Sequence, residues 1–322
     1  MPIRRRAALA LPFLMPASLR AQAPAWPSRG IRIIVSYPPG GATDVVTRKV
    51  AEAISPLLGV PCVVENKAGG SGTIGTAEVA RAAPDGYTLL GNDNSYAMLP
   101  YVFARLPFDH ARDLVPVTVS NFAPVVLTVK ASSRFRTLAD LVAEAKAKPG
   151  VVNYGTGGVG SSLHFAAEAF QQAAGVELFH IPFKGAGEAT LNLLNGTVEM
   201  VMGSLPSAMA NVKAGTIRAL AVCGTERSAA VPDVPLFQQA GVGGFNMVNW
   251  VGLAAPRGTP DAVVQRLQQA VVQALAAPAM RDFLAGQGAT PGGLAPDAFA
   301  ALIAAETALW RDVAAKARIT PQ

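Results

Sequence analysis

The sequence predicts an α/β fold in which two lobes are joined by two strands. Strand-like and helix-like segments alternate from residue 31 to 90, and a second alternation runs from 137 to 222. Two β-rich segments, 114–129 and 246–255, flank the second block. Because such alternation favours parallel sheets with right-handed crossovers, we expect the second block to be inserted into the first, with a cleft between them.

The two β-rich segments also set the expected boundaries. At 322 residues and 51% hydrophobic content, the chain is long enough for two domains. We expect an export signal over 1–23, a first lobe formed by 24–123 and 250–322, and a second lobe formed by 124–249. A single doubly wound sheet is the alternative on pattern alone.

The first block begins with a buried strand over 31–37 that runs into a glycine turn. A helix over 43–58 follows, with an apolar stripe along one face and Gly59 as its stop signal. The remaining expected elements are a strand over 60–65, a glycine loop over 68–76, a helix over 74–83 and a strand over 87–90.

The segment 114–129 reads as a long β-rich run that is broken near Pro124. Beyond it, a capping box at Thr137 opens a helix that ends at Pro149. Strands are then expected over 151–154, 177–182, 198–202 and 217–222, helices over 163–174, 187–194 and 206–214, and C-terminal helices over 260–276, 278–287 and 296–317.

The N-terminus has the pattern of a cleaved export signal. Arg4 to Arg6 precede an apolar stretch, and Ala21-Gln22-Ala23 reads as a cleavage site, so we expect a periplasmic protein cut near Ala23. Losing residues 1–23 removes four arginines and lowers the formal charge from +6 to +2. Clustered basic residues with interleaved aromatics are absent, which argues against nucleic acid as a partner.

Metal and redox chemistry are weakly indicated. Cys62 and Cys223 each lie in a strand-like apolar segment, which favours buried thiols over a disulfide. The three histidines, His110, His164 and His180, have no short-range ligand spacing. We therefore expect no metal and no cofactor.

A dinucleotide site is the first alternative to weigh. Gly155, Gly157 and Gly160 match G-x-G-x-x-G, but the next strand ends in Ile181-Pro182-Phe183-Lys184 without the acid that would bind a ribose. Catalysis is also poorly supported, because G-x-S-x-G, H-E-x-x-H and suitably spaced carboxylate pairs are absent. We expect a binding protein and not an enzyme.

Two glycine loops carry the functional hypothesis. The first, 37–44, and the second, 155–162, each connect a strand to a helix, where free N–H groups and the helix dipole can bind an anion. Glycines at such turns are also explained by sterics alone. For His164, Lys184 and Asp44, a ligand contact and a structural role both stay open.

Several segments resemble one family in order along the chain: residues 31–44, VVENKAGGSGTIGT, APDGYTLL, AKPGVVNYGTGG, HIPFKGAGEAT and LPSAMANVKAGTIRALAV. They resemble the receptors of tripartite tricarboxylate transporters, the Bug or TctC-like proteins. The resemblance implies a type II periplasmic binding fold, a small carboxylate ligand, membrane permease subunits as partners and a monomeric receptor.

Matched by position, the resemblance points to ligand contacts on both sides of the cleft, while departures at Tyr37, at 94–96 and before Ser204 leave the ligand's identity open. The expected contacts are Tyr37, Gly40, Gly41, Ala42, Thr43, Asp44, Asn94, Ser95, Thr156, Gly157, Gly158, Ser161, His164, Lys184, Gly185, Gly203 and Ser204. Whether Asp44 or Asp93 meets a ligand ammonium is not decided by sequence. A receptor for a signalling partner is the second hypothesis, and an exported enzyme is the third.

Overall fold

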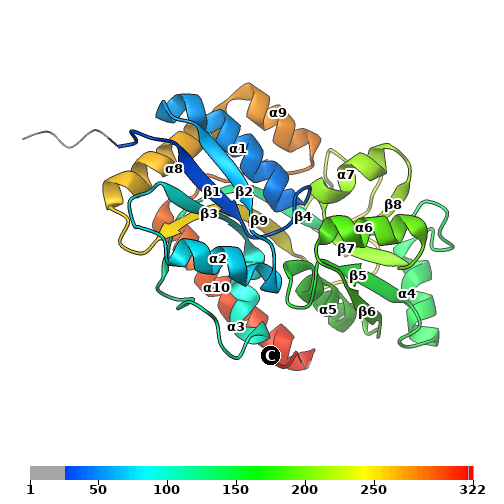
Figure 1. Ribbon diagram of the computed structural model, residues 1–322. Coiled ribbons are helices and arrows are strands. Elements are labelled where there is room, and N and C mark those ends of the chain that lie inside the picture. Colours follow the sequence, from blue (N-terminus) through cyan, green and yellow to red (C-terminus); the bar gives the residue numbers. More distant parts are fainter. Residues whose placement is uncertain (1–25, 318, 322) are drawn as a thin grey trace, which may run out of the picture.

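The computed structural model describes residues 26–317 and 319–321, so the expected export signal lies outside the described residues. The strands form two sheets that share strand β4, Leu114–Lys130, and the sheets stand side by side in Figure 1. Among the described residues, no helix combines the length and apolar character needed to cross a membrane.

The first sheet has the order β2-β1-β3-β9-β4, with the short strand β10 beside β4. Strand β1 pairs in parallel with β2 and β3, as the alternation predicted, whereas β9 pairs antiparallel with β3 and β4. The bounds are β1 Ile31–Val35, β2 Cys62–Asn66, β3 Thr88–Asp93, β9 Val248–Pro256 and β10 Thr290–Pro291.

Helices cover both faces of this sheet, so its strands are apolar on both sides. Ile33 packs with the helices of one face, and its neighbour Ile34 packs with the opposite face, as alternation along a strand requires. The first face carries α1 Ala42–Leu58, α8 Asp261–Ala276 and α9 Pro278–Gly286; the second carries α2 Thr73–Ala80 and α10 Pro296–Lys316.

The second sheet continues from β4 through β7, β5 and β6, with β8 also pairing with β4. Leu127 of β4 points to the face covered by α4 and α5, and Val126 points to the face covered by α6 and α7. The bounds are β5 Asn153–Thr156, β6 Phe179–Pro182, β7 Met200–Ser204, β8 Ile217–Val222, α4 Leu138–Ala147, α5 Ser162–Ala174, α6 Ala186–Asn195 and α7 Leu205–Lys213.

The predicted break near Pro124 is wrong. Strand β4 is continuous for 17 residues, and Pro124 marks the point at which its partners change. Up to Pro124 the strand pairs with β9, and from Val125 onward it pairs with β7. A proline lacks the N–H that a strand interior needs, so it is tolerated where one ladder ends and another begins. The two lobes are therefore joined at β4 and at the entry to β9.

Other elements differ at their ends or were not predicted. The helix expected over 74–83 ends at Ala80, ahead of Pro84. The third strand extends to Asp93, and two short helices, η2 Asn94–Met98 and α3 Leu99–Val102, follow it directly. The capping box at Thr137 is confirmed by its reciprocal bonds with Asp140.

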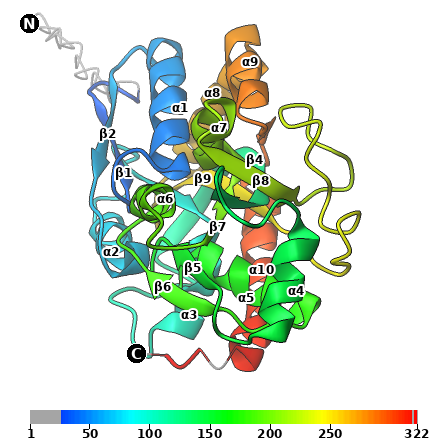
Figure 2. The same cartoon turned by 90° about the vertical axis from the view of Figure 1, so that its right-hand side faces the viewer.

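Helix α10 packs against elements of both lobes. Near its start, Phe299 packs edge to face on Trp250 of β9. Near its end, Trp310 packs edge to face on Phe165 of α5. Figures 1 and 2 show the helix running from below the first sheet to the side of α5. The exact lobe boundaries stay a prediction, because the last helix serves both cores.

Candidate functional site

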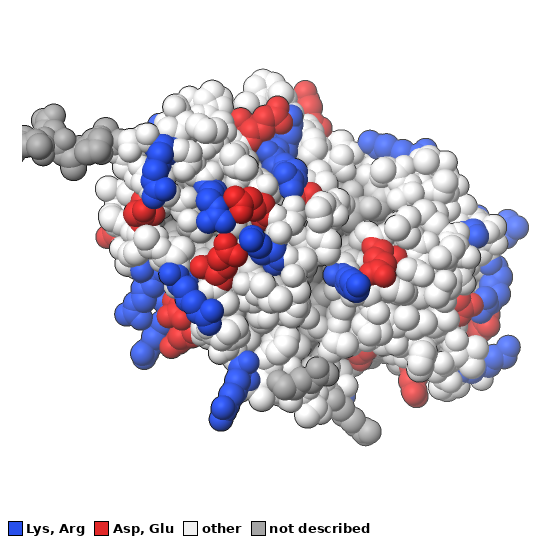
Figure 3. Space-filling view, in the orientation of Figure 1, with Lys and Arg blue, Asp and Glu red and all other residues white. Residues whose placement is uncertain are grey.

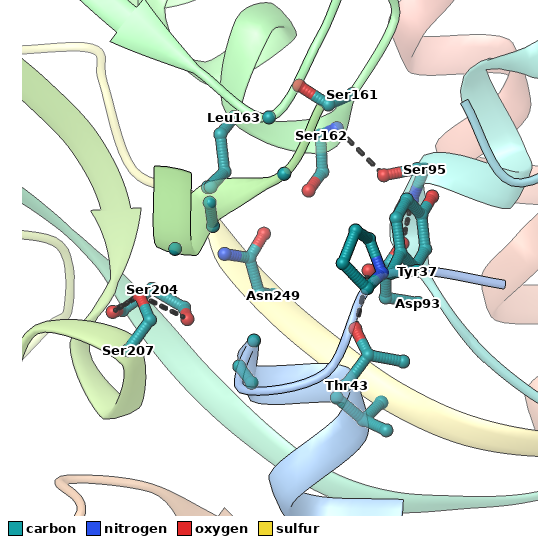
Figure 4. A pocket seen from close by; sticks show the side chains of 18 of the residues that line it. Tyr37, Thr43, Asp93, Ser95, Ser161, Ser162, Leu163, Ser204, Ser207 and Asn249 are labelled. Carbon is teal, nitrogen blue, oxygen red and sulfur yellow. Dashed lines mark hydrogen bonds between the residues drawn. The ribbon is translucent and has the colours of Figure 1, made fainter. Parts of the chain in front are cut away.

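A cavity of about 590 Å³ lies where the two sheets meet, and both lobes line it. Four helices, α1, α5, α6 and α7, direct their N-terminal ends toward it. The lining residues are Tyr37, Pro38, Pro39, Gly41, Ala42, Thr43, Asp93, Asn94, Ser95, Asn121, Ala123, Gly157, Ser161, Ser162, Leu163, Lys184, Gly185, Ala186, Gly187, Glu188, Leu191, Ser204, Ser207, Asn249, Trp250 and Val251. Figure 4 shows part of this lining.

The first loop is closed by the side chain of Asp44. Gly40 N donates to Asp44 Oδ2 over 3.0 Å, while Arg48 Nε and Asn66 Nδ2 donate to Oδ1 over 2.9 and 2.8 Å. Burial opposes ionisation of this carboxyl, but the hydrogen bonds outweigh it and hold the pKa of Asp44 below its usual value. Asp44 and Gly40 therefore satisfy each other, and neither lines the cavity.

The start of α1 offers free donors to the cavity. Its N-cap, Gly41, supplies no side-chain acceptor. The N–H groups of Ala42 and Thr43 have no partner in the described part of the protein, and both residues line the cavity. Unpaired first-turn N–H groups and the helix dipole make this end of α1 attractive to an anion.

The second loop is closed differently, by hydroxyl groups. Thr156 Oγ1 accepts from Gly158 N over 3.2 Å, and Ser161 Oγ donates to Gly158 O over 2.8 Å. Ser161 also caps α5, accepting from His164 N. Of the expected contacts in this loop, Gly157 and Ser161 line the cavity, whereas Thr156, Gly158 and His164 do not.

His164 belongs to a stack behind the loop. Its ring lies 4.2 Å from that of His180, which in turn lies 4.9 Å from Tyr154. Gly160 N donates to His164 Nδ1 over 3.2 Å, which requires that nitrogen to be unprotonated. Burial lowers the pKa of His164 to about 4, and burial together with His164 lowers that of His180 to about 3. Both rings are neutral supports of the loop at pH 7.

The starts of α6 and α7 complete the wall contributed by the second lobe. Gly185 is the N-cap of α6 and has no side chain to occupy the first N–H groups, so those of Ala186 and Gly187 are free. A Cβ on Gly157 would lie 3.1 Å from Ala186 N, so glycine permits the close approach of these two segments. Lys184 lines the exposed rim, and Ser204 and Ser207 face the cavity at α7 while Gly203 does not.

Among the described residues, two hydrogen bonds join the second loop, 155–162, to the first lobe. Ser71 Oγ donates to Val159 O over 2.7 Å, and Ser162 N donates to Ser95 Oγ over 2.8 Å. Ser71 holds a left-handed backbone conformation at φ 50°, which is strained for a residue with a side chain. The first lobe therefore already satisfies one N–H group at the start of α5.

Three asparagines of the cavity have side chains without hydrogen-bond partners among the described residues. These are Asn94 after β3, Asn121 on β4 and Asn249 on β9, each at most 7% exposed. Buried side-chain amides normally have hydrogen-bond partners, so three unpaired amides around one cavity point to a polar ligand. Together with Asp93, which lines the cavity beside them, we call these residues the cavity floor.

Sequence patterns missed much of the floor. Asn121 and Asn249 lie inside β-rich segments, where they resemble ordinary strand residues. Register explains their position: Asn121 of β4 and Asp93 of β3 both pair with Val251, one from each side, and Asn249 lies two residues away on the same face. The sequence does show one polar residue in each of two otherwise apolar segments. That pattern indicates a shared site only when the pairing of the two strands is known.

Within the described residues, no group of three or more His, Cys, Asp or Glu side chains is placed to hold a metal ion. On the face drawn in Figure 3, acidic and basic side chains are interspersed over the surface. A cavity between two α/β lobes, walled by helix N-termini, defines a binding protein for a small polar solute.

Comparison with known proteins identifies the family. Residues 46–318 match the model of the tripartite tricarboxylate transporter family receptor, TctC, and the chain belongs to this family of periplasmic solute-binding receptors. The protein BugT of Bordetella pertussis is 36% identical over 305 residues, which cover 94% of each chain. The predicted family and two-lobed periplasmic-binding-protein fold are confirmed.

Two solved structures are similar over nearly their whole length. Rpa4515 of R. palustris, solved with adipate, is 33% identical with a TM-score of 0.89, covering 92% of this chain and 100% of that one. MatC of Rhodopseudomonas palustris, solved with bound malate, is 30% identical with a TM-score of 0.85, covering 90% and 100%. Both neighbours thus hold small dicarboxylates.

Proposed function

We propose that this chain is an exported receptor that captures a small carboxylate and delivers it to the membrane subunits of a tripartite tricarboxylate transporter. The observation that carries the proposal is the convergence of four helix N-termini on one cavity between the lobes. Free N–H groups at Ala42, Thr43, Ala186 and Gly187 supply donors from both sides.

This arrangement suits an anion without a fixed counter-charge. Lys184, the basic residue of the lining, is exposed at the rim, so oriented N–H groups are the main source of positive potential inside. Hydrogen bonds to an ionised acceptor are stronger than neutral ones. Similarity to proteins solved with adipate and malate supports the same class of ligand here.

Under this proposal, ligand contacts come from the predicted residues that line the cavity, and the two lobes close about β4 and β9 when the carboxylate binds both walls. The contacting set is Tyr37, Gly41, Ala42, Thr43, Asn94, Ser95, Gly157, Ser161, Lys184, Gly185 and Ser204. The transporter would recognise the closed arrangement, and the export signal would be cleaved near Ala23 as the chain is exported.

The test is thermal unfolding of the chain without residues 1–23 in the presence of mono-, di- and tricarboxylates, amino acids and neutral sugars. We expect at least one carboxylate-bearing compound to raise the Tm by several degrees, because a ligand at 100 times its Kd adds about 2.7 kcal/mol of stability. Sugars should have no effect. A panel without any carboxylate-dependent shift would contradict the proposal.

A further inference from the structure

The carboxylate of Asp93 lines the cavity at the end of β3 and is bonded by neutral groups. Thr43 Oγ1 donates to Asp93 Oδ2 over 2.8 Å, and Ser95 N donates to Oδ1 over 3.0 Å. Figure 4 shows Asp93 between Thr43 and Tyr37, with Ser95 nearby. The hydroxyl groups of Ser95 and Tyr37 also hydrogen-bond this carboxylate, so every described group bonded to it is neutral.

The surroundings of Asp93 supply no positive charge. Its titratable neighbours are the Tyr37 hydroxyl, of the first loop, and the buried Glu306 carboxyl of α10, which is bonded by Trp250 Nε1. Within the described residues, Asp93 takes part in no ion pair. Withdrawal from solvent raises the pKa of Asp93, and its hydrogen bonds offset this only in part. A buried carboxylate in this state is stabilised by an added cation.

Thr43 connects Asp93 to the expected anion site. Its hydroxyl binds Asp93, while its backbone N–H in the first turn of α1 is unpaired and the residue lines the cavity. A ligand carboxylate bound to the first N–H groups of α1 would therefore lie close to a second carboxylate. Two like charges at this separation repel, unless the ligand also carries a positive group next to its own carboxylate.

We propose that Asp93 binds an ammonium group adjacent to the ligand's carboxylate, so that the captured solute is an α-amino acid. This inference rests on the proposed function and narrows its ligand class. An α-amino acid places its two charged groups on one carbon, which matches the neighbouring positions of Asp93 and the start of α1.

The rest of the floor would receive the amino acid side chain. Asp93 and Asn121 flank Val251 in register, so two strand spacings, roughly 10 Å, separate their backbones. The unpartnered amide of Asn121 lies across Val251 from Asp93, and that of Asn249 lies two residues along β9; both can donate and accept. A polar side chain is therefore favoured over an aliphatic one.

The first experiment needs no variant. The twenty standard L-amino acids are screened by thermal shift, and the best binder is compared by calorimetry at pH 7.5 with its α-hydroxy and unsubstituted analogues, as in L-aspartate, L-malate and succinate. We expect the amino acid to bind at least 10-fold more tightly than either analogue. No binding by any amino acid, or equal binding by an analogue, overturns the inference.

The second experiment uses Asp93→Asn, which keeps the shape and removes the charge, with Asp282→Asn on the exposed face of α9 as the matched control. Asp93→Asn should weaken amino acid binding at least 10-fold and leave the unsubstituted acid unchanged or bound more tightly. Equal losses for both ligands would overturn the inference. If carboxylates bind but the α-substituent has no influence, the assignment of Asp93 fails while the proposed receptor function stands.

Discussion

The two glycine loops have the same place in their lobes but satisfy their backbone in opposite ways. In the first loop, the buried carboxylate of Asp44 turns back to Gly40 and leaves the first N–H groups of α1 free. In the second loop, the hydroxyls of Thr156 and Ser161 bind within the loop and cap α5.

The similar sequence patterns of the two glycine loops suggest that both have the same role. Their hydrogen bonding shows that the roles differ. At the end of the first loop the N–H groups of both Ala42 and Thr43 are unpaired, whereas at the start of α5 Ser162 N and His164 N have partners and Leu163 N is unpaired. Neutral histidines support the second loop. Additional free donors of the second lobe come from α6, whose N-cap is a glycine. Substitutions in the two loops should therefore affect different measurements.

The largest effect is expected for Gly41→Val. A Cβ at Gly41 meets no protein atom within 4 Å, and its backbone has an ordinary negative φ, so the fold should tolerate the change. The new side chain would occupy the space at the start of α1. We expect the affinity for a carboxylate identified by thermal shift to fall at least 100-fold in calorimetry.

Gly243→Val is the control, since Gly243 is exposed and a Cβ at this position would also meet no atom within 4 Å. Both variants should unfold within a few degrees of the parent chain. Unchanged affinity in Gly41→Val would show that the start of α1 does not hold the ligand.

An intermediate effect, on stability, is expected for Asp44→Ala. The substitution removes the acceptor that Gly40 N, Asn66 and Arg48 share. A hydrogen bond to a charged group contributes about 2 kcal/mol, so the folded state should lose stability. Urea unfolding without ligand should show this loss. If the variant keeps its stability and loses only ligand affinity, then Asp44 is a ligand contact after all.

The smallest effect concerns pH and the second loop. His164 and His180 have pKa values of about 4 and 3 in the folded chain and an ordinary value of 6.5 when unfolded. Between about pH 6.5 and 4, the unfolded chain binds more protons, so these residues make stability fall as the pH is lowered.

His180→Gln removes one such group, and the slope of unfolding free energy against pH in this window should decrease by up to about 1.4 kcal/mol per pH unit. Slopes are compared rather than absolute stabilities, because the substitution also removes ring stacking. An unchanged slope would mean that His180 is not buried in its neutral form.

Most of the fold was accessible from the sequence, because its helices and parallel strands are local patterns with clear stop signals. The apolar stripe ending at Gly59 and the capping box at Thr137 each correspond to a helix. The continuity of β4 through Pro124 could not be predicted from the sequence. A proline that breaks a strand and a proline that marks a change of strand partners give the same local sequence pattern.

The sequence predicted only part of the cavity. Its walls follow glycine turns that sequence marks clearly, such as Gly41 and Gly185. The direction in which a side chain points is a tertiary property, so Asp44 and His164 could not be distinguished in advance from true lining residues. Asn121 and Asn249 were missed because they become neighbours only through the pairing of β4 with β9.

The packing of α10 has a consequence for how the molecule folds. Trp310 and Ala314, near the end of the chain, complete a core otherwise built from residues of its middle part, while Phe299 serves the core built around β9. Neither core is complete before α10 has been synthesised and docked. Contacts that span most of the chain slow folding, so the protein stays incompletely packed for as long as its C-terminal segment is unplaced.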